Sequence, residues 1–332
     1  MYDPPLRYPN KYKRLYPIVE GIGVTTDLLK VELHCHNVYS NSRNQSDRIP
    51  FDCGVTLEQL LDSAIKEKID VLFVTNHNTL KGYHEILDYQ QNHRKYYSIR
   101  IYPAEEITVD NGGHVLAYGI TKTITPGMTL EETLDEIKRQ NAVSCAAHPF
   151  AVSNGIRGKA NLCDLMESFN SNNVDLFSNI LASKFAEYHK MFTIAGSDSH
   201  VCSTVGRCRN AIESENNIDS VIDNLVRGRS KIHSANYATK KELYEHAYYV
   251  LSSSSEALMN YVSEYHPQAY HIFKWALTSF TSNPNSRFWY TLGSFALYLT
   301  TRVSKKVNMG GYTPEIFQER SWKRLISLAL VP

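Results

Sequence analysis

The chain has 332 residues, enough for one large domain or for one domain with a sizeable appendage. Hydrophobic residues make up 42% and charged residues 21%, which excludes a disordered or collagen-like chain. The net charge of +1 excludes a global electrostatic field that would recruit nucleic acid or an anionic membrane, so any recognition of phosphate must be local.

The cellular location is predicted from the cysteines and from the N-terminal residues. None of the six cysteines forms a Cys-x-x-Cys pair, and the first residues contain no apolar segment of the kind found in a secretory signal. We therefore predict reduced thiols and a cytoplasmic protein. No stretch is apolar for long enough to span a bilayer, and we interpret the nearest, residues 288–303, as a buried helix.

Short apolar runs alternate with amphipathic segments from residue 28 onwards, after a Pro-, Tyr- and Lys-rich stretch (1–27) that we expect to be an extended lead-in. The predicted strands are 29–34, 71–75, 98–104, 115–119, 142–147, 164–169 and 192–196, and the predicted helices are 56–66, 129–140 and 218–227. Thr56 and Thr129 are the expected N-caps of two of these helices. Alternating strands and helices indicate β/α units, a mostly parallel sheet and a closed or nearly closed barrel over residues 28–238.

From about residue 239 the pattern becomes helical and rich in Tyr and Ser. We predict that residues 239–332 form a helical extension that packs on the barrel, on a partner or on another copy of the chain. Aromatic and basic residues gather in 265–325. Helices at a membrane interface combine these residue types, but we favour a surface that packs on protein.

Six of the 13 histidines fall at the ends of predicted strands: His34, His36, His77, His114, His148 and His200. Barrel enzymes carry their chemistry at the C-terminal ends of the strands, so six imidazoles on one rim predict a metal site. Within a strand, His34 and His36 point to the same face and Cys35 to the other, where a buried thiol is expected. The remaining histidines, His246 among them, lack such a context and are interpreted as ordinary residues.

Two carboxylates, like the histidines, follow predicted strands. Glu106 follows the strand 98–104, and Asp198 stands two residues before His200. A carboxylate can bridge two ions, and paired ions activate a water and stabilise both the attacking and the leaving oxygen of a hydrolysis. Imidazole combined with carboxylate suits zinc, manganese or iron. Glu167, at the end of another strand, is expected to make structural hydrogen bonds.

Seven segments resemble, in the same order, motifs of the PHP family, which is named for polymerase and histidinol phosphatase: VELHCHNVYSNS, DVLFVTNHNTLKGY, PAEEIT, GGHVLAYGI, AAHPF, DLMESFNS and AGSDSHVCSTVGR. The resemblance covers about residues 29–235 and is greatest to stand-alone archaeal and bacterial members. It implies a distorted (β/α)7 barrel with a metal cleft at the C-terminal ends of its strands.

The resemblance also implies two or three divalent ions (manganese, zinc or iron). The first would be held by His34, His36, Glu106 and Asp198; the second by Glu106, as a bridge, with His114 and His148; and the third by His77 and His200. Glu106 is preferred to Glu105 because the glutamate of the family precedes an Ile/Val–Ser/Thr pair, here Ile107–Thr108. Neighbours on a strand face opposite sides, so only one of the two glutamates is expected to point into the site.

The sequence departs from the family pattern in two places. The family motif TDHD is TNHN here, so Asn76 and Asn78 replace acids and the site is expected to be less negative. Members usually carry Asp or His five or six residues after the His-x-His pair, where this chain has Asn41 and Ser42.

The second departure affects the third ion. We hypothesise that this ion is weakly bound, absent, or held by a carboxylate from the following stretch, Asp47 or Asp52, that folds back toward the site. Metal counting with and without the Asp47→Ala substitution would test the first of these two candidates.

Arg157 in the SNGIRGK loop and Arg207 in the TVGR turn are candidate phosphate ligands, because a guanidinium binds phosphate through a planar fork. With Glu106, His148 and Asp198 they complete the predicted catalytic set, which would promote in-line attack by a metal-activated hydroxide. The predicted enzyme is a metal-dependent phosphoesterase for phosphomonoesters, nucleotides or short oligonucleotides, with no obligate nucleic-acid partner. A 3′–5′ exonuclease and a non-catalytic binding module are the alternatives.

Overall fold

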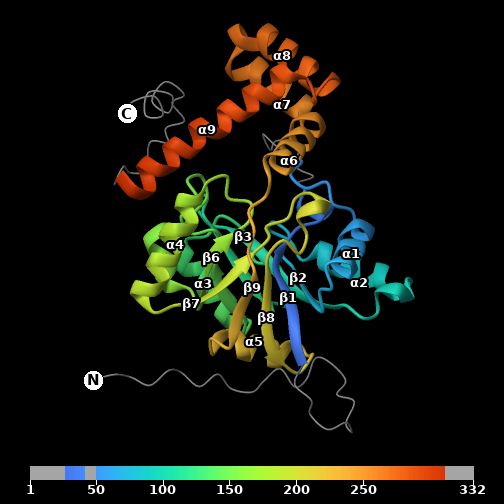
Figure 1. The fold of residues 1–332 in the computed structure, drawn as a ribbon, viewed down its shortest axis with the longest axis vertical. Coiled ribbons are helices and arrows are strands. Elements are labelled where there is room, and N and C mark those ends of the chain that lie inside the picture. Colours follow the sequence, from blue (N-terminus) through green and yellow to red (C-terminus); the bar gives the residue numbers. More distant parts are fainter. Residues whose placement is uncertain (1–26, 42–49, 311–332) are drawn as a thin grey trace.

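The computed structural model describes residues 27–41 and 50–310, which form one nine-stranded sheet with helices around it (Figure 1). The strands are β1 (Asp27–Cys35), β2 (Val71–Val74), β3 (Arg100–Thr108), β4 (His114–Tyr118), β5 (Val143–Ala146), β6 (Leu165–Asn170), β7 (Phe192–Gly196), β8 (Arg209–Ser214) and β9 (Ser230–Ser234). The helices are α1 (Leu57–Lys66), α2 (Lys81–Gln91), α3 (Leu130–Arg139), α4 (Leu176–His189), α5 (Ile218–Val226), α6 (Lys240–Ser253), α7 (Ser255–Tyr265), α8 (Tyr270–Ser282) and α9 (Arg287–Gly310).

The sheet is mixed, so the expectation of a mostly parallel sheet was wrong. Its order is β7-β6-β5-β4-β3-β2-β1-β8-β9, and four of its eight strand pairings are antiparallel. Strands β3 and β4 are joined by a tight turn in which the Val109 N–H donates to the Gly113 carbonyl at 2.9 Å and Gly112 has a φ of 79°. A connection this short cannot contain a crossover helix. The seven-unit count of a (β/α)7 barrel is not confirmed, but a mixed α/β fold with a nearly closed, barrel-like sheet is.

The predicted strands and helices all exist, with ends that differ by a few residues. The capping boxes are formed as expected, because Thr56 accepts from the Gln59 N–H and Thr129 from the Glu132 N–H. Four elements were not predicted: α2, α4, β8 and β9. The strands were missed because their sequences, RNAIES and SKIHS, offer no run of apolar residues.

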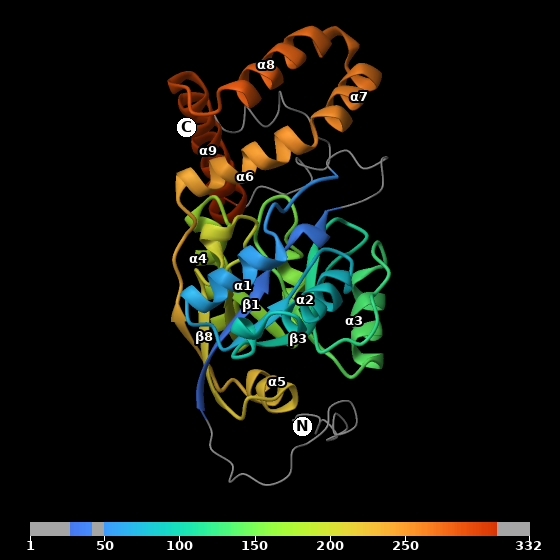
Figure 2. The same ribbon diagram turned by 90° about the vertical axis from the view of Figure 1, so that its right-hand side faces the viewer.

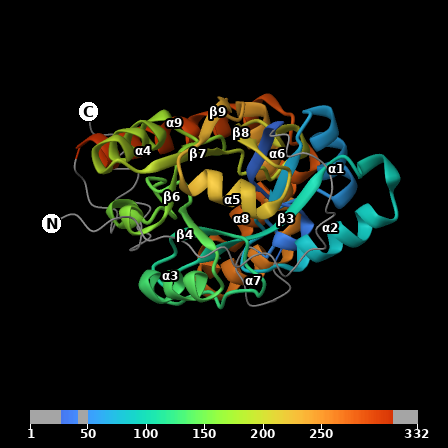
Figure 3. The same cartoon turned by 90° about the horizontal axis from the view of Figure 1, so that it is seen from below.

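Side chains complete the barrel where strand pairing stops. The Asn210 amide on β8 accepts from the Ala195 N–H at 3.0 Å and donates to the Ala195 carbonyl at 2.8 Å, which links β8 to β7. Helix α5 lies across the lower end of the barrel, as seen from below in Figure 3, and packs Val221 and Leu225 into the core cluster of the sheet. Fully burying one such side chain contributes about 1.5–3 kcal/mol. The lower end is therefore closed by hydrophobic packing.

The helices α6 to α9 lie across the opposite end of the barrel (Figures 1 and 2). Strand β9 ends at Ser234 and α6 begins at Lys240, whereas the lead-in before residue 27 and the last part of the extension, 311–332, lie outside the described residues. The expectation of a buried helix over 288–303 was wrong: α9 exposes Phe288, Phe295 and Tyr298 by half or more. None of the described helices combines the length and the apolar character needed to cross a membrane.

Candidate metal centre

The predicted histidines and carboxylates meet at the end of the barrel that the extension covers. His34 is the last residue but one of β1, Glu106 lies within β3, and His114 begins the antiparallel β4. The others follow the ends of β1, β2, β5 and β7. An isolated bridge pairs His77 with Glu106 and another pairs Cys35 with Ser199, so the loops that carry these residues are held as extensions of the sheet. The strand ends thus bring together side chains from six parts of the chain.

The first cluster consists of His34, His36, Glu106 and Asp198, all of them buried. The Nε2 atom of His34 lies 3.2 Å from Glu106 Oε2 and 3.4 Å from Asp198 Oδ1. The Nε2 atom of His36 lies 3.2 Å from each of the same two oxygens. Cys35 turns the other way, buried, with its Sγ 3.3 Å from the Phe73 carbonyl oxygen. The His-x-His pair therefore presents two imidazoles to one carboxylate pair.

The Nε2 atom of His36 tests whether these residues fit a metal ion. It is buried and has no hydrogen-bond partner among the described residues, although two carboxylate oxygens lie nearby. Burial, followed by the charge of His200, lowers the pKa of His36 and favours the neutral imidazole that binds metals. An unpartnered neutral nitrogen facing two carboxylates suits a divalent cation with mixed nitrogen and oxygen ligands, so the residues fit such an ion.

Glu106 faces a second set of imidazoles with its other oxygen. Its Oε1 atom lies 2.8 Å from His114 Nδ1 and 3.0 Å from His148 Nε2. Burial alone would raise the pKa of Glu106, but His77, His114 and His34 together hold it well below its usual range. Glu106 is therefore an ionised carboxylate that faces two separate groups of nitrogen donors.

The neighbouring glutamate points away from this cluster. Glu105 is buried on the opposite face of β3, where its Oε2 accepts from the Ile124 N–H at 3.0 Å. Burial raises the pKa of Glu105 to about 8, because only one hydrogen bond supports its charge. The alternation along β3 thus places Glu106, not Glu105, among the histidines.

Glu167 holds two members of the cluster in place. Its Oε1 lies 2.7 Å from His34 Nδ1, and its Oε2 accepts from the His148 backbone N–H at 2.7 Å. Asn170 donates to Glu167 Oε2 at 3.0 Å and to Asp198 Oδ2 at 3.2 Å. A carboxylate on Nδ1 fixes the tautomer that leaves Nε2 free to bind a metal. His148 and Asp198 also have left-handed backbones (φ 26° and 50°), a strain that folded proteins retain mainly at functional sites.

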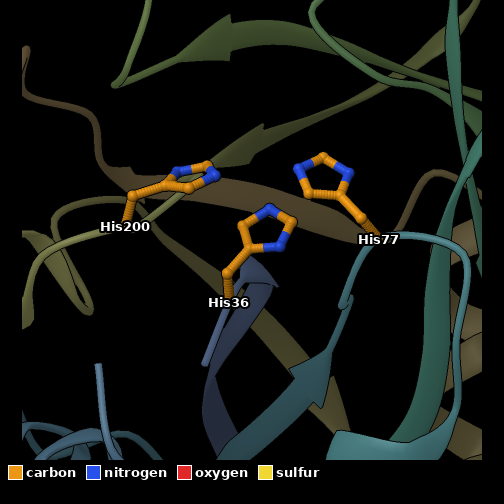
Figure 4. A group of neighbouring side chains, drawn as sticks. All are labelled: His36, His77 and His200. Carbon is orange, nitrogen blue, oxygen red and sulfur yellow. The ribbon is translucent and has the colours of Figure 1, made fainter. Parts of the chain in front are cut away.

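A third group lies beside the first. Figure 4 shows the rings of His36, His77 and His200 turned toward one another, with centroid distances from His36 of 4.6 and 4.4 Å. The carboxylate that joins them is Asp52, whose Oδ2 lies 2.8 Å from His200 Nε2 and 3.2 Å from His77 Nε2. Of the residues hypothesised to fold back, Asp52 does so, whereas Asp47 lies outside the described residues.

The three asparagines that depart from the family pattern act on the backbone and on other side chains. Asn41 accepts from the backbone N–H groups of Asp52 and Cys53 at 2.8 and 2.9 Å, which brings Asp52 to the site. Asn76 accepts from Ser40 Oγ at 3.1 Å, and Ser40 Oγ lies 2.9 Å from His36 Nδ1. Asn78 accepts from the Thr108 N–H at 2.8 Å. Ser42 lies outside the described residues.

The two candidate arginines both contact the C-terminal helices. Arg157 Nη2 donates to Asn308 Oδ1 on α9 at 2.8 Å, its guanidinium lies 5.5 Å from the Phe150 ring centroid, and its buried Nη1 has no hydrogen-bond partner in the described ranges. Arg207 forms an ion pair with Glu242 on α6. The role of both arginines in phosphate binding stays a prediction, and Arg157 keeps one nitrogen for a further acceptor.

Sequence reasoning missed two residues at this end of the barrel. His246 on α6 stacks on His200, with ring centroids 4.6 Å apart. Glu32 is buried on β1 and accepts from the backbone N–H groups of His34, Ser197 and Gly206, and burial raises its pKa to about 7. An acid within an apolar strand two residues before the His-x-His pair could have marked Glu32. Nothing in the sequence around His246 distinguishes it from the other histidines of the extension.

Comparisons with known proteins give partial matches. The family model described as PHP-associated matches residues 177–230. An uncharacterized protein of Methanocaldococcus jannaschii is 27% identical over 124 residues, which cover 37% of this chain and 69% of that protein. Among solved structures, PsfC from Pseudomonas syringae PB-5123 is 19% identical, with a TM-score of 0.49, over 68% of this chain and 98% of that one. The lesion-specific endonuclease PfuEndoQ from Pyrococcus furiosus is 15% identical, with a TM-score of 0.43. The match covers 62% of this chain and 58% of that one.

Proposed function

We propose that the chain is a metal-dependent phosphoesterase that hydrolyses phosphomonoesters, nucleotides or short oligonucleotides. The match of residues 177–230 to the PHP-associated family model supports this proposal. The observation that carries the proposal is the position of Glu106. One of its oxygens faces His34 and His36, and the other faces His114 and His148. A bridging carboxylate between two groups of imidazoles is the ligand arrangement of a paired-metal hydrolase.

The side chains fall into two roles in this proposal. His34, His36, Glu106 and Asp198 would hold one divalent ion, and Glu106, His114 and His148 a second. Such ions, when bound, lower the pKa of a water and polarise the phosphoryl oxygens. Glu167 keeps the Nδ1 side of His34 occupied so that Nε2 faces the ion, and it fixes the backbone of His148.

Arg157 is the favoured contact for the non-bridging oxygens of the substrate. Its Nη1 atom is unpartnered, and its guanidinium is held between Phe150 and Asn308, so little conformational freedom would be lost on binding. Arg207 is engaged with Glu242 and would have to release that partner first. We therefore expect Arg157→Ala to raise KM more than Arg207→Ala does.

A substrate panel tests the proposal. The purified protein is stripped with a chelator, reloaded separately with Mn²⁺, Zn²⁺ or Fe²⁺, and assayed on a phosphomonoester, a phosphodiester, nucleoside monophosphates, and short and long single-stranded DNA and RNA. His36→Ala is the site variant because the His36 Nε2 atom is buried without a hydrogen-bond partner among the described residues. His271→Ala, an exposed histidine on α8, is the matched control.

The expected result is metal-restored hydrolysis in the native chain and in His271→Ala, with a loss of at least about a hundredfold in His36→Ala. Preference for long strands would favour the exonuclease. Activity that is equal in His36→Ala, or no activity with any of the metals, would contradict the proposal and favour a binding module.

A further inference from the structure

The loop before α1 is packed against the C-terminal extension. The Phe51 N–H donates to Ser254 Oγ at 3.3 Å, and Asn41 Nδ2 donates to the Tyr249 hydroxyl at 3.1 Å. Gly54 lies so close to Tyr249 that a Cβ atom there would stand 2.8 Å from the ring. Figures 1 and 2 show α6 crossing the end of the barrel above this loop. The conformation that brings Asp52 to the histidines is thus shaped by α6.

Helix α6 also brings its own imidazole to Asp52. His246 Nε2 lies 2.8 Å from the Asp52 carbonyl oxygen and 3.4 Å from its carboxylate Oδ1, while Oδ2 of the same carboxylate faces His200 and His77. Asp52, His200 and His246 each offer a ligand atom, and these atoms lie within 4.8 Å of one another. The side chains of Asp52 and His246 are 33% and 20% exposed, so an ion could reach them from solvent.

These contacts gather several imidazoles around one carboxylate. Three histidines from separate elements approach the single Asp52 carboxylate. Imidazole nitrogens and a carboxylate oxygen that converge in this way are a ligand set that a zinc-type cation accepts. Asp52 and His246 together supply the ligands that the His-x-His loop lacks at Asn41, whose amide is used on the backbone of Asp52 and Cys53.

We propose that His246, with Asp52 and His200, binds a divalent cation of the zinc type, and that this cation fastens the C-terminal helices over the metal centre. The proposal rests on the metal centre of the proposed function and extends it, because it assigns a ligand and a role to the extension. On binding, the ring proton of His246 passes from Nε2 to Nδ1 by exchange with solvent, and Nε2 exchanges its hydrogen bond to the Asp52 carbonyl for coordination.

The consequence is a cover whose closure depends on the cation. Without the ion, α6 is held by the His246–Asp52 hydrogen bond, the Arg207–Glu242 ion pair, the Tyr249–Asn41 hydrogen bond and the packing of Tyr249 on Gly54. Because a ligand that binds only the closed form stabilises that form, the cation should slow the opening of α6.

Two measurements without substrate test this inference. Zinc content per chain is measured after dialysis against a series of free Zn²⁺ concentrations, and hydrogen exchange of residues 240–253 is followed by mass spectrometry with and without Zn²⁺. The variants are His246→Ala and His246→Gln, because a Gln amide can still donate to the Asp52 carbonyl but is a poor zinc ligand. His271→Ala is the matched control within the extension, and His36→Ala reports on the Glu106 centre.

We expect Zn²⁺ to slow exchange over 240–253 by roughly tenfold or more in the native chain and in His271→Ala. Both His246 variants should lose this protection and one equivalent of bound zinc, while keeping the zinc that His36→Ala removes. Protection and zinc content that persist in His246→Gln would overturn the inference and leave His246 as a hydrogen-bond donor. If the native chain binds no zinc, manganese or iron at all, the proposed function fails together with it.

Discussion

Glu167→Gln removes one negative charge from behind His34 without removing any metal ligand. In the native chain, Oε1 of Glu167 lies 2.7 Å from His34 Nδ1, and Oε2 accepts from the His148 N–H and from Asn170 Nδ2. A glutamine has only one oxygen, and the two donors at His148 and Asn170 will claim it. Its NH2 group then faces His34 Nδ1, which must become an acceptor, so the ring proton moves to the Nε2 atom that should bind the ion.

The wrong tautomer has to be reversed before metal can bind. Changes behind a metal-ligating histidine typically weaken binding by about 10- to 100-fold, which corresponds to about 1.4–2.7 kcal/mol. The assay is a competition titration of metal-free protein with Zn²⁺ against a chromophoric chelator. Thermal unfolding of the metal-free variant, measured in parallel, separates a loss of affinity from a loss of fold.

Glu105→Gln is the matched control, because Glu105 is also buried on a barrel strand but bonds the Ile124 N–H on the face away from the histidines. It should bind Zn²⁺ as the native chain does. A Glu167→Gln variant whose Kd stays within about twofold of the native value would refute the reasoning, because His34 would then not depend on its carboxylate partner.

Three further predictions concern the same end of the barrel. Gly196→Ala would place a methyl group 1.8 Å from Glu167 Oε1, so it should weaken zinc binding about as much as Glu167→Gln and cost about 1–3 kcal/mol in urea unfolding; native-like affinity would contradict this. Asn76→Asp would turn the 2.7 Å donor contact to Asn37 Oδ1 into an approach of two oxygens, so the free energy of unfolding should fall by about 1–3 kcal/mol, whereas an equal or higher value would show that an acid is tolerated there. Free Zn²⁺ at about 100 times Kd should stabilise the chain by about 2.7 kcal/mol in thermal unfolding, and a chelator should reverse this; an unchanged Tm would argue against a native-state metal site.

Local patterns predicted the parts of the site that depend on one strand. The two-residue repeat of His34 and His36, and the alternation that separates Glu106 from Glu105, follow from the geometry of an extended chain. In the structure His34 and His36 face the same carboxylates, and Glu106 faces the histidines while Glu105 faces away, as expected. The choice of Glu106 also depended on the family motif, because alternation alone does not say which of two neighbours faces inward.

The features that were missed depend on distant parts of the chain. His246 stands on a helix about two hundred residues from Asp52, and its orientation follows from how α6 crosses the barrel, which no local periodicity encodes. Strand β8 was missed because it is recruited by pairing with β1 and by the Asn210 amide rather than by an apolar run. The cytoplasmic location and association through the C-terminal helices stay predictions.

The most direct test of a shared carboxylate is anomalous diffraction from crystals grown with Mn²⁺ or Zn²⁺. Apart from any ion at Asp52 and His246, the account predicts one peak on each side of Glu106. One lies within ligand distance of His34, His36 and Asp198, and the other near His114 and His148, both about 2.0–2.2 Å from a Glu106 oxygen. A missing peak at either of these two positions, or a fully ligated ion there that does not touch Glu106, would contradict the claim that Glu106 bridges a paired-metal centre.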